Sequence, residues 1–242
     1  MSKKFLFMLL FVMLNLVALC SPNKKEKGEK MNVLKTIDLP EPRYDSKVSV
    51  ESAIKNRRSI RSYRDQALEL DHVSQILWAA YGITKPMKTG PGYLRGGLRA
   101  APSAGARYPL EIYLVCGNVE QLEAGIYKYD SRNHKLELLS SGDKMQDLAK
   151  AAYGQSHVKN AAANIFYSAI YERTTSKYGE RGRDRYVCMD LGHSAENVYL
   201  QAHALNIGTC AVGAFSDQQA REVMQLPDEE TPLYIMPLGY IK

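Results

Sequence analysis

RYVCMDLGHSAENVYLQAHALNIGTCAVGAF, residues 185–215, is the stretch that decides the fold. Residues 185–205 form the longest predicted helix, apolar around most of its circumference, with small side chains at Gly192, Ala195 and Ala202. Residues 209–215 (TCAVGAF) predict a buried strand directly after it. We therefore expect a close-packed central helix lying against a sheet.

The elements predicted on either side of this stretch alternate between strands and helices. Apolar runs predict strands at 111–116, 162–171 and 233–241, and a hairpin of 125–129 with 135–139. Apolar spacing predicts helices at 48–56, 71–81 behind Asp71, 144–153 behind Asp143, and from the Ser216-x-x-Gln219 capping box to Met224. Residues 85–99, rich in Gly and Pro, read as a loop. This order predicts helices on both faces of a sheet.

Composition argues against nucleic acid as a partner. The 242-residue chain is 45% hydrophobic and 24% charged, with a formal net charge of +6. Residues 1–30 contain six lysines and two acids, so the remainder carries only +2. Binding to nucleic acid needs a clustered basic face, and so small an excess gives little reason to expect one.

The N-terminus predicts export. Lys3 and Lys4 precede an apolar run that ends at Cys20, and the run is short for a membrane-spanning helix. Residues 1–20 therefore read as a signal sequence, 21–45 as a tether and lead-in, and 46–242 as the folded domain. The ending at Cys20 resembles a lipobox, which would give a periplasmic, membrane-anchored lipoprotein. An ordinary cleavage site and a retained membrane anchor stay open as alternatives, because Leu19 departs from the small residue usual before the lipidated cysteine.

Cysteine and histidine spacing does not indicate a metal site. Cys116, Cys188 and Cys210 show no C-x-x-C pattern and are expected to be buried free thiols. The histidines lack metal-ligand spacing. Asp190 and His193 share one face of the long helix, and His193 is interpreted as a core histidine rather than a catalytic one.

Three further motifs carry residue types suited to binding. RRSIRSY (57–63) places three arginines and two serines after a short helix, which suits a phosphate group but also a solvated basic turn. PSAGARYPLEIYLV (102–115) has small residues that permit close backbone approach, or form an ordinary turn. Gly213 in the predicted strand 209–215 fits close approach of a ligand, or a bulge.

Taken together and in order, these segments resemble the nitroreductase family, and most closely its SagB-type, azoline-dehydrogenase-like branch. The resemblance extends from about residue 50 to residue 242. Its matching strings are RRSIRSY, ILWAAYGIT, APSAGARYPLEIYLV, AGIYKYD, the stretch 177–215 and MPLGYIK.

The resemblance implies an α+β fold with a mixed sheet flanked by helices, and a homodimer with FMN at the subunit interface. Arg57, Arg58, Ser59 and Arg61 would hold the FMN phosphate and ribityl chain. Pro102, Ser103, Ala104 and Gly105 would reach the flavin from the other subunit. Val212 and Gly213 would lie beside the flavin ring, with a backbone N–H toward N5.

The implied activity is ping-pong hydride transfer from NAD(P)H through FMN to a small acceptor of the nitroaromatic or quinone type. One alternative is a SagB-type dehydrogenase of peptide azolines, in which Lys177 and Tyr178 would remove the proton. Another is a flavin-binding or interaction module without catalysis, since a fold does not fix a function.

Overall fold

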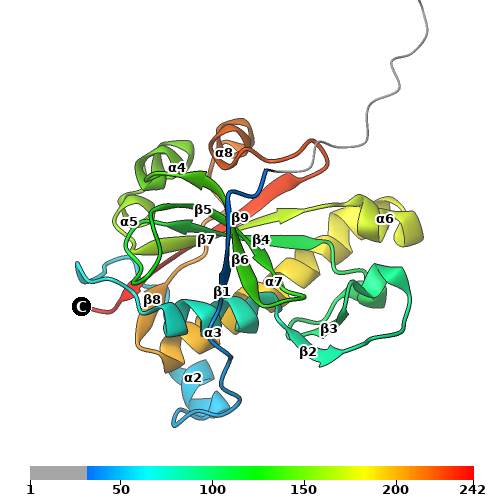
Figure 1. Cartoon of the computed structure of the whole chain (residues 1–242), viewed down its shortest axis with the longest axis horizontal. Coiled ribbons are helices and arrows are strands. Elements are labelled where there is room, and N and C mark those ends of the chain that lie inside the picture. Colours follow the sequence, from blue (N-terminus) through cyan, green and yellow to red (C-terminus); the bar gives the residue numbers. More distant parts are fainter. Residues whose placement is uncertain (1–31) are drawn as a thin grey trace, which may run out of the picture. The chain divides into compact units, whose positions relative to one another are not determined.

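The computed structural model describes residues 32–242, so the predicted signal sequence, Cys20 and residues 21–31 of the predicted tether and lead-in lie outside the described residues. In the described part, seven strands form one sheet in the order β1-β6-β5-β4-β7-β9-β8 (Figure 1). Their bounds are β1 (Lys35–Asp38), β4 (Leu110–Cys116), β5 (Gly125–Asp130), β6 (Lys135–Ser141), β7 (Ala163–Ala169), β8 (Ile207–Thr209) and β9 (Thr231–Tyr240).

Pairing in the sheet is mainly antiparallel. Each ladder between these strands is antiparallel, and parallel pairing within residues 32–242 occurs as isolated bridges, Ser59 with Thr209 and Leu68 with Val119. The predicted α+β class with a sheet flanked by helices is confirmed, and the mixed character of the sheet is limited to these two parallel bridges. The strands predicted at 111–116, 162–171 and 233–241 and the 125–139 hairpin are present as β4, β7, β9 and β5–β6.

Helices cover both faces of the sheet (Figure 1). Helices α3 (Leu70–Tyr81) and α7 (Val187–Ala204) pack in one hydrophobic cluster, and α4 (Met145–Ala151), α5 (Ser156–Lys159) and α8 (Asp217–Met224) pack in the other. Strand β7 lies between them and is buried at each position, with Tyr167 in the first cluster and Phe166 in the second. Because both faces are covered, its sequence does not alternate between apolar and exposed polar residues, and even its two polar side chains, Asn164 and Ser168, are buried.

Two segments predicted to lack regular structure contain strands. Residues 35–38, inside the predicted lead-in, pair with β6 as the edge strand β1. In the predicted loop 85–99, β2 (Ile83–Pro86) and β3 (Gly97–Arg99) form a separate two-stranded sheet. Gly96, at φ +105°, supplies the left-handed backbone that lets the chain turn back into β3.

The strand predicted at 209–215 is wrong in its bounds. Strand β8 ends at Thr209, and pairing with β9 resumes only at the isolated bridge between Val212 and Ile235. One cause of the interruption is Pro237 in β9, which has no N–H to donate. The N–H and carbonyl of Val212 both face β9, so the N–H of Ala211 faces away from that strand and donates to the Tyr199 hydroxyl at 2.7 Å.

The predicted helices are present, with differences at their ends and surfaces. Helix α3 begins at Leu70, so Asp71 lies inside the first turn and is not the N-cap. Helix α7 follows a π-helical turn at Gly182–Tyr186. One face of α7 is exposed in the single chain, so His193 and Cys188 are surface residues and not core residues as predicted. Among residues 32–242, no helix has the length and apolar character to span a membrane.

Candidate functional site

The first group of predicted site residues lies at the end of α2 (Val50–Asn56), beside α7. We call Arg57, Arg58, Ser59, Arg61 and Tyr199 the arginine cluster. The Arg57 guanidinium lies 5.1 Å from the centre of the Tyr199 ring, a cation–π distance, and 4.0 Å from the Glu196 carboxylate. Arg58 donates only to backbone carbonyls. Among the described residues, no ion pair involves Arg58 or Arg61.

Tyr199 joins this cluster to the segment after β8. Its hydroxyl lies 3.1 Å from the Ser59 hydroxyl and accepts the N–H of Ala211 at 2.7 Å. The Ile60 N–H donates to the Thr209 carbonyl at 2.9 Å, which brings residues 57–61 alongside β8. Two motifs about 150 residues apart in sequence are therefore neighbours, held by one tyrosine and one backbone bridge.

Val212 and Gly213 differ in what their backbones can offer a ligand. The Val212 N–H donates to the Ile235 carbonyl at 2.9 Å, so it is already engaged. Gly213 is exposed, and its N–H has no acceptor within residues 32–242. Of the two predicted residues, Gly213 is the one whose N–H is available. The expectation that Gly213 lies inside a buried strand is wrong.

The second group of predicted residues is gathered around Asp190 on α7. We call Pro102, Ser103, Ala104, Gly105, Lys177, Tyr178 and Asp190 the Ser103 cluster. The Asp190 carboxylate is 2% exposed and accepts the Ser103 hydroxyl at 2.5 Å and the Ala104 N–H at 3.2 Å. Burial raises the pKa of Asp190, and the hydrogen bonds from Ser103 and Ala104 oppose this shift. Asp190 therefore fixes the 102–105 segment to the helix.

Gly105 brings Lys177 and Tyr178, at the end of α6 (Glu172–Tyr178), against the same segment. Gly105 has φ +58°, and a Cβ added there would lie 2.5 Å from the Tyr178 hydroxyl and 2.9 Å from Lys177 Nζ. The Lys177 ammonium lies 5.1 Å from the centre of the Tyr178 ring. This close approach requires glycine for space as well as for backbone conformation.

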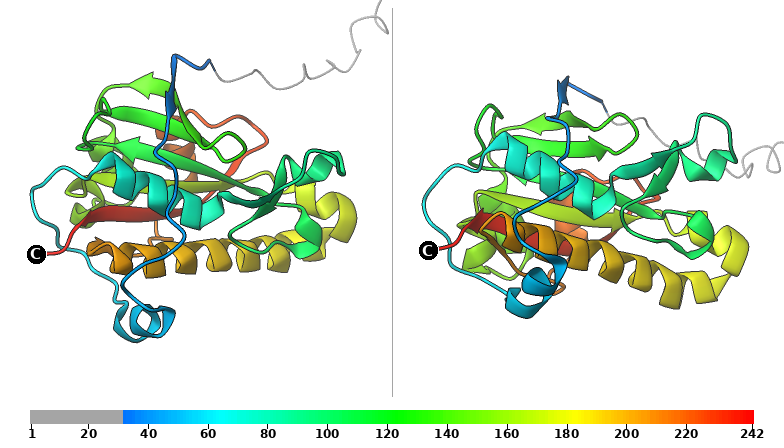
Figure 2. Two further views of the ribbon diagram at one scale, coloured as in Figure 1. Left: turned by 60° about the horizontal axis from the view of Figure 1, so that its bottom comes forward. Right: turned by 90° about the horizontal axis from the view of Figure 1, so that it is seen from below.

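The two clusters lie at opposite parts of α7. Nine residues separate Asp190 from Tyr199, which is roughly 13 Å along the axis at 1.5 Å per residue. Figure 2 shows α2 beside the C-terminal part of α7, and α6 and the segment after β3 at its other end. A single chain thus gathers the predicted residues into two groups and not one.

Sequence analysis named Asp190 only as a neighbour of His193 and did not single out Tyr199, yet these two residues hold the clusters together. A carboxylate on the packed face of an apolar helix is a signal for Asp190, since buried acids need hydrogen-bond donors. Tyr199 carries no comparable signal in the sequence. Its partners Ser59 and Ala211 are separated from it along the chain, and only the fold brings them together. In the described residues, no group of three or more His, Cys, Asp or Glu side chains could hold a metal ion.

These features define an α+β protein with helices on both faces of its sheet and two polar clusters along one central helix. The model of the Nitroreductase family matches residues 54–240. The nitroreductase-family protein MJ1384 of Methanocaldococcus jannaschii is 41% identical over 192 residues, 79% of this chain and 91% of that protein. The trifolitoxin-processing protein TfxB of Rhizobium leguminosarum bv. trifolii is 34% identical over 146 residues, 58% of this chain and 38% of that protein.

A solved nitroreductase-family structure from Ralstonia eutropha aligns with a TM-score of 0.72 and 26% identity, covering 92% of this chain and 98% of that one. The chain belongs to the nitroreductase family. Members of this family are in general dimeric oxidoreductases that bind FMN. The family predicted from the sequence is confirmed, and TfxB agrees with the resemblance to the SagB-type branch.

Proposed function

We propose that the protein is an FMN-dependent oxidoreductase that takes electrons from NAD(P)H and passes them to a small nitroaromatic or quinone-like acceptor. The observation that carries this proposal is the meeting of residues 57–61 with the segment after β8 around Tyr199. Around Tyr199 the fold gathers three arginines, of which only Arg57 has an acidic partner among residues 32–242, and the segment that carries the free Gly213 N–H.

The residues of the arginine cluster fit FMN by their donor chemistry. Arg57, Arg58 and Arg61 offer planar forks suited to phosphate oxygens, and Ser59 adds a hydroxyl. The nearest acid, Glu196, reaches only Arg57, at 4.0 Å. Gly213, whose N–H has no acceptor in the described residues, would face the ring. When bound, FMN supplies the hydride chemistry, while the protein supplies orientation and a site shielded from water.

An absorbance spectrum of the purified protein tests this function. We expect a flavin spectrum, a heat-released cofactor that comigrates with FMN on chromatography, and bleaching on anaerobic addition of NAD(P)H. Bound flavin without bleaching would favour a non-catalytic flavin-binding module. Finding FAD, or finding no flavin even after reconstitution with FMN, would contradict the proposal.

We propose further that the active form is a homodimer in which each site takes its arginine cluster from one chain and its Ser103 cluster from the other. The separation of the two clusters along α7 supports this arrangement. So does the exposure of apolar side chains on α2 and α7, namely Val50 at 64%, Ile54 at 60% and Met189 at 50%. Sedimentation that finds a stable monomer retaining FMN would contradict it.

A second candidate function is dehydrogenation of peptide azolines. The observation in its favour is that Lys177 and Tyr178, the pair predicted for proton removal, lie against Gly105. A thiazoline-containing peptide offered to FMN-loaded protein tests this candidate. Oxidation of the peptide that is lost in Lys177→Ala, with NAD(P)H oxidation retained, would favour it over the small-acceptor function.

For the part of the chain before residue 32 we propose export as a lipoprotein anchored through Cys20. The lysine-rich stretch 24–30 would add attraction to anionic headgroups. Cys20→Ser is expected to leave the precursor unprocessed, so that the mature membrane-bound form does not appear. Native protein found in the cytoplasm with Met1 intact would contradict export, and would strengthen the peptide-azoline alternative.

A further inference from the structure

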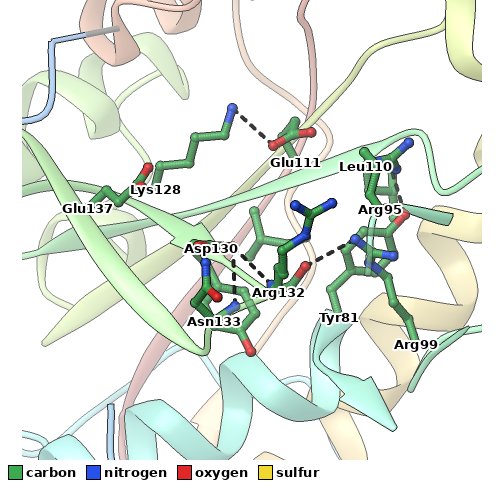
Figure 3. Close-up of a pocket in the computed structure, with 13 residues that line it drawn as sticks. Tyr81, Arg95, Arg99, Leu110, Glu111, Lys128, Asp130, Arg132, Asn133 and Glu137 are labelled. Carbon is green, nitrogen blue, oxygen red and sulfur yellow. Dashed lines mark hydrogen bonds and ion pairs between the residues drawn. The ribbon is translucent and has the colours of Figure 1, made fainter. Parts of the chain in front are cut away.

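A polar cavity lies away from both clusters, where β4 begins and the β5–β6 hairpin turns. Its volume is about 300 Å³, at the small end of the range for ligand sites. Arg95 and Arg99 line it from the β2–β3 region, and Arg132 lines it from the hairpin turn. Figure 3 shows Arg95 and Arg99 on one side of the cavity, Glu137 and Lys128 on the other, and Arg132 between them.

The three arginines have no acidic partners. Within residues 32–242, no ion pair involves Arg95, Arg99 or Arg132. Arg95 donates to backbone carbonyls, including those of Arg107 and Tyr108. Arg132 is exposed, and no hydrogen bond of its guanidinium occurs among the described residues. Cationic side chains that lie close together without an ion-paired acid are costly unless an anion joins them.

Arg99 gives the clearest sign of an absent partner. Its side chain is 9% exposed and lies over the rings of Tyr81 and Tyr108, at 5.0 and 4.6 Å. Its Nη atoms donate to carbonyls and to the Ser131 hydroxyl, but its buried Nε–H has no acceptor. A buried N–H of a charged group without an acceptor is rare in native proteins and calls for a specific explanation.

The other charged residues of the lining are mostly engaged already. Lys128 pairs with Glu111 at 3.0 Å and Glu230 at 2.9 Å, and Glu111 also pairs with Arg173 at 2.5 Å. The Asp130 carboxylate accepts N–H groups of the hairpin turn, including the Arg132 backbone N–H at 2.9 Å. These interactions leave the arginine side of the cavity with net positive charge.

Two acids of the lining, Asp130 and Glu137, have no ion pair among the described residues. Burial raises the pKa of Glu137 above the ordinary value. Burial and the neighbouring charges of Arg173 and Arg99 lower the pKa of Arg95 to about 10. The pKa shift of Arg95 thus reflects burial and neighbouring cations, whereas the carboxylates of Asp130 and Glu111 add to the pKa shift that burial causes at Glu137.

We propose that this cavity binds a small oxyanion, the carboxylate or phosphate group of a ligand, between Arg95, Arg99 and Arg132. The Arg132 guanidinium suits either group, because its planar fork can match two oxygens at once. Arg99 adds its unpartnered Nε–H, and Arg95 adds its positive charge. The proposal does not depend on FMN or on the oxidoreductase function, since none of the three arginines belongs to the arginine cluster.

The site also contacts the segment that leads to the Ser103 cluster. Arg95 donates to the Tyr108 carbonyl, and the Tyr108 N–H donates to the Ser103 hydroxyl at 2.8 Å. Tyr108 has φ +49°, a left-handed conformation that is unfavourable for a tyrosine and must be held by its surroundings. An oxyanion bound at Arg95 therefore lies within two hydrogen bonds of Ser103.

Calorimetric titration with inorganic phosphate, and separately with succinate, at ionic strength held constant by sodium chloride tests the site. We expect saturable binding of at least one probe. Saturation by phosphate alone identifies a phosphate site, and saturation by succinate alone identifies a carboxylate site. Arg132→Ala should weaken binding about tenfold or more, as expected for loss of a charged hydrogen bond. Because Arg132 is exposed, the variant should fold normally.

Two control variants separate this site from general salt effects and from the arginine cluster. Arg64→Ala removes another exposed arginine and should leave the affinity unchanged. Arg57→Ala disables the arginine cluster and should also leave it unchanged. The proposal is overturned if neither probe saturates, if Arg132→Ala binds as tightly as the wild type, or if Arg57→Ala removes the binding instead.

Discussion

The arginine cluster and the Ser103 cluster lie along the same helix, α7, but different interactions hold each of them together. The arginine cluster is cationic and joined by a neutral tyrosine hydroxyl, with Arg58, Ser59 and Arg61 exposed and Arg57 and Tyr199 half-buried. The Ser103 cluster is fixed by a buried carboxylate and requires a left-handed glycine. The arginine cluster is suited to attract a charged ligand and contributes little to the free energy of unfolding. The Ser103 cluster is suited to hold the backbone in one conformation. Mutations should therefore affect binding in the first and stability in the second.

The largest expected effect is on stability, at the anchor of the Ser103 cluster. Asp190→Ala removes the acceptor for Ser103 and Ala104, and we expect it to lower the free energy of unfolding by about 3 kcal/mol, the scale of two lost hydrogen bonds to a charged group. The matched change in the other cluster, Tyr199→Phe, breaks neutral hydrogen bonds and should cost about 1 kcal/mol. Urea denaturation measures both. Equal costs would remove the distinction between the clusters.

The next effect is on ligand affinity, in the arginine cluster. Arg57→Ala should weaken FMN binding by about 2 kcal/mol, the scale of a lost charged hydrogen bond, while the free energy of unfolding of the apoprotein stays nearly constant. Fluorescence titration of apoprotein with FMN gives the affinity, with Arg64→Ala as the control. An unchanged affinity in Arg57→Ala would exclude Arg57 from the flavin site.

A pair of glycines, one in each cluster, tests the third expectation. Gly105→Ala should lower the free energy of unfolding by about 1–2 kcal/mol, because a Cβ is disfavoured at φ +58° and would lie 2.5 Å from the Tyr178 hydroxyl. At Gly213 an added Cβ would meet only the Tyr234 ring, at 3.5 Å, an ordinary contact. Gly213→Ala should therefore change stability by less than about 0.5 kcal/mol. Thermal denaturation compares the two, and the reverse order would contradict the geometry.

The smallest effect is a pH dependence that belongs to Asp190. Burial raises its pKa in the folded state, so its contribution to stability is complete below the unfolded value and is lost as pH rises through the folded value. The difference in free energy of unfolding between wild type and Asp190→Asn should accordingly fall as pH is raised from about 3.8. Denaturation curves of both proteins across this range measure the slope, and a difference that grows with pH would show a depressed pKa instead.

Periodicity in the sequence predicted the elements whose environment is uniform along their length. Strands β4, β7 and β9 are mostly apolar because both faces of the sheet are covered, and α3 and α7 carry apolar residues at helical spacing. Strand β1 escaped prediction because an exposed edge strand needs no apolar pattern. The segment 209–215 was misassigned because an apolar run does not reveal where its hydrogen-bond partners stop, and here the pairing is interrupted at Pro237, which has no N–H.

By itself, the sequence determined the family, the alternation of strands and helices, and the segments that carry the candidate site residues. Those features depend on composition and spacing within short windows, which the chain carries locally. Only the tertiary structure decided that these segments fall into two clusters along α7, that Asp190 and Tyr199 hold them, and that Gly213 has a free N–H while Val212 does not. Each of these depends on contacts between residues far apart in the chain, and such contacts are set by the packing of α7 against the sheet and not by any local pattern.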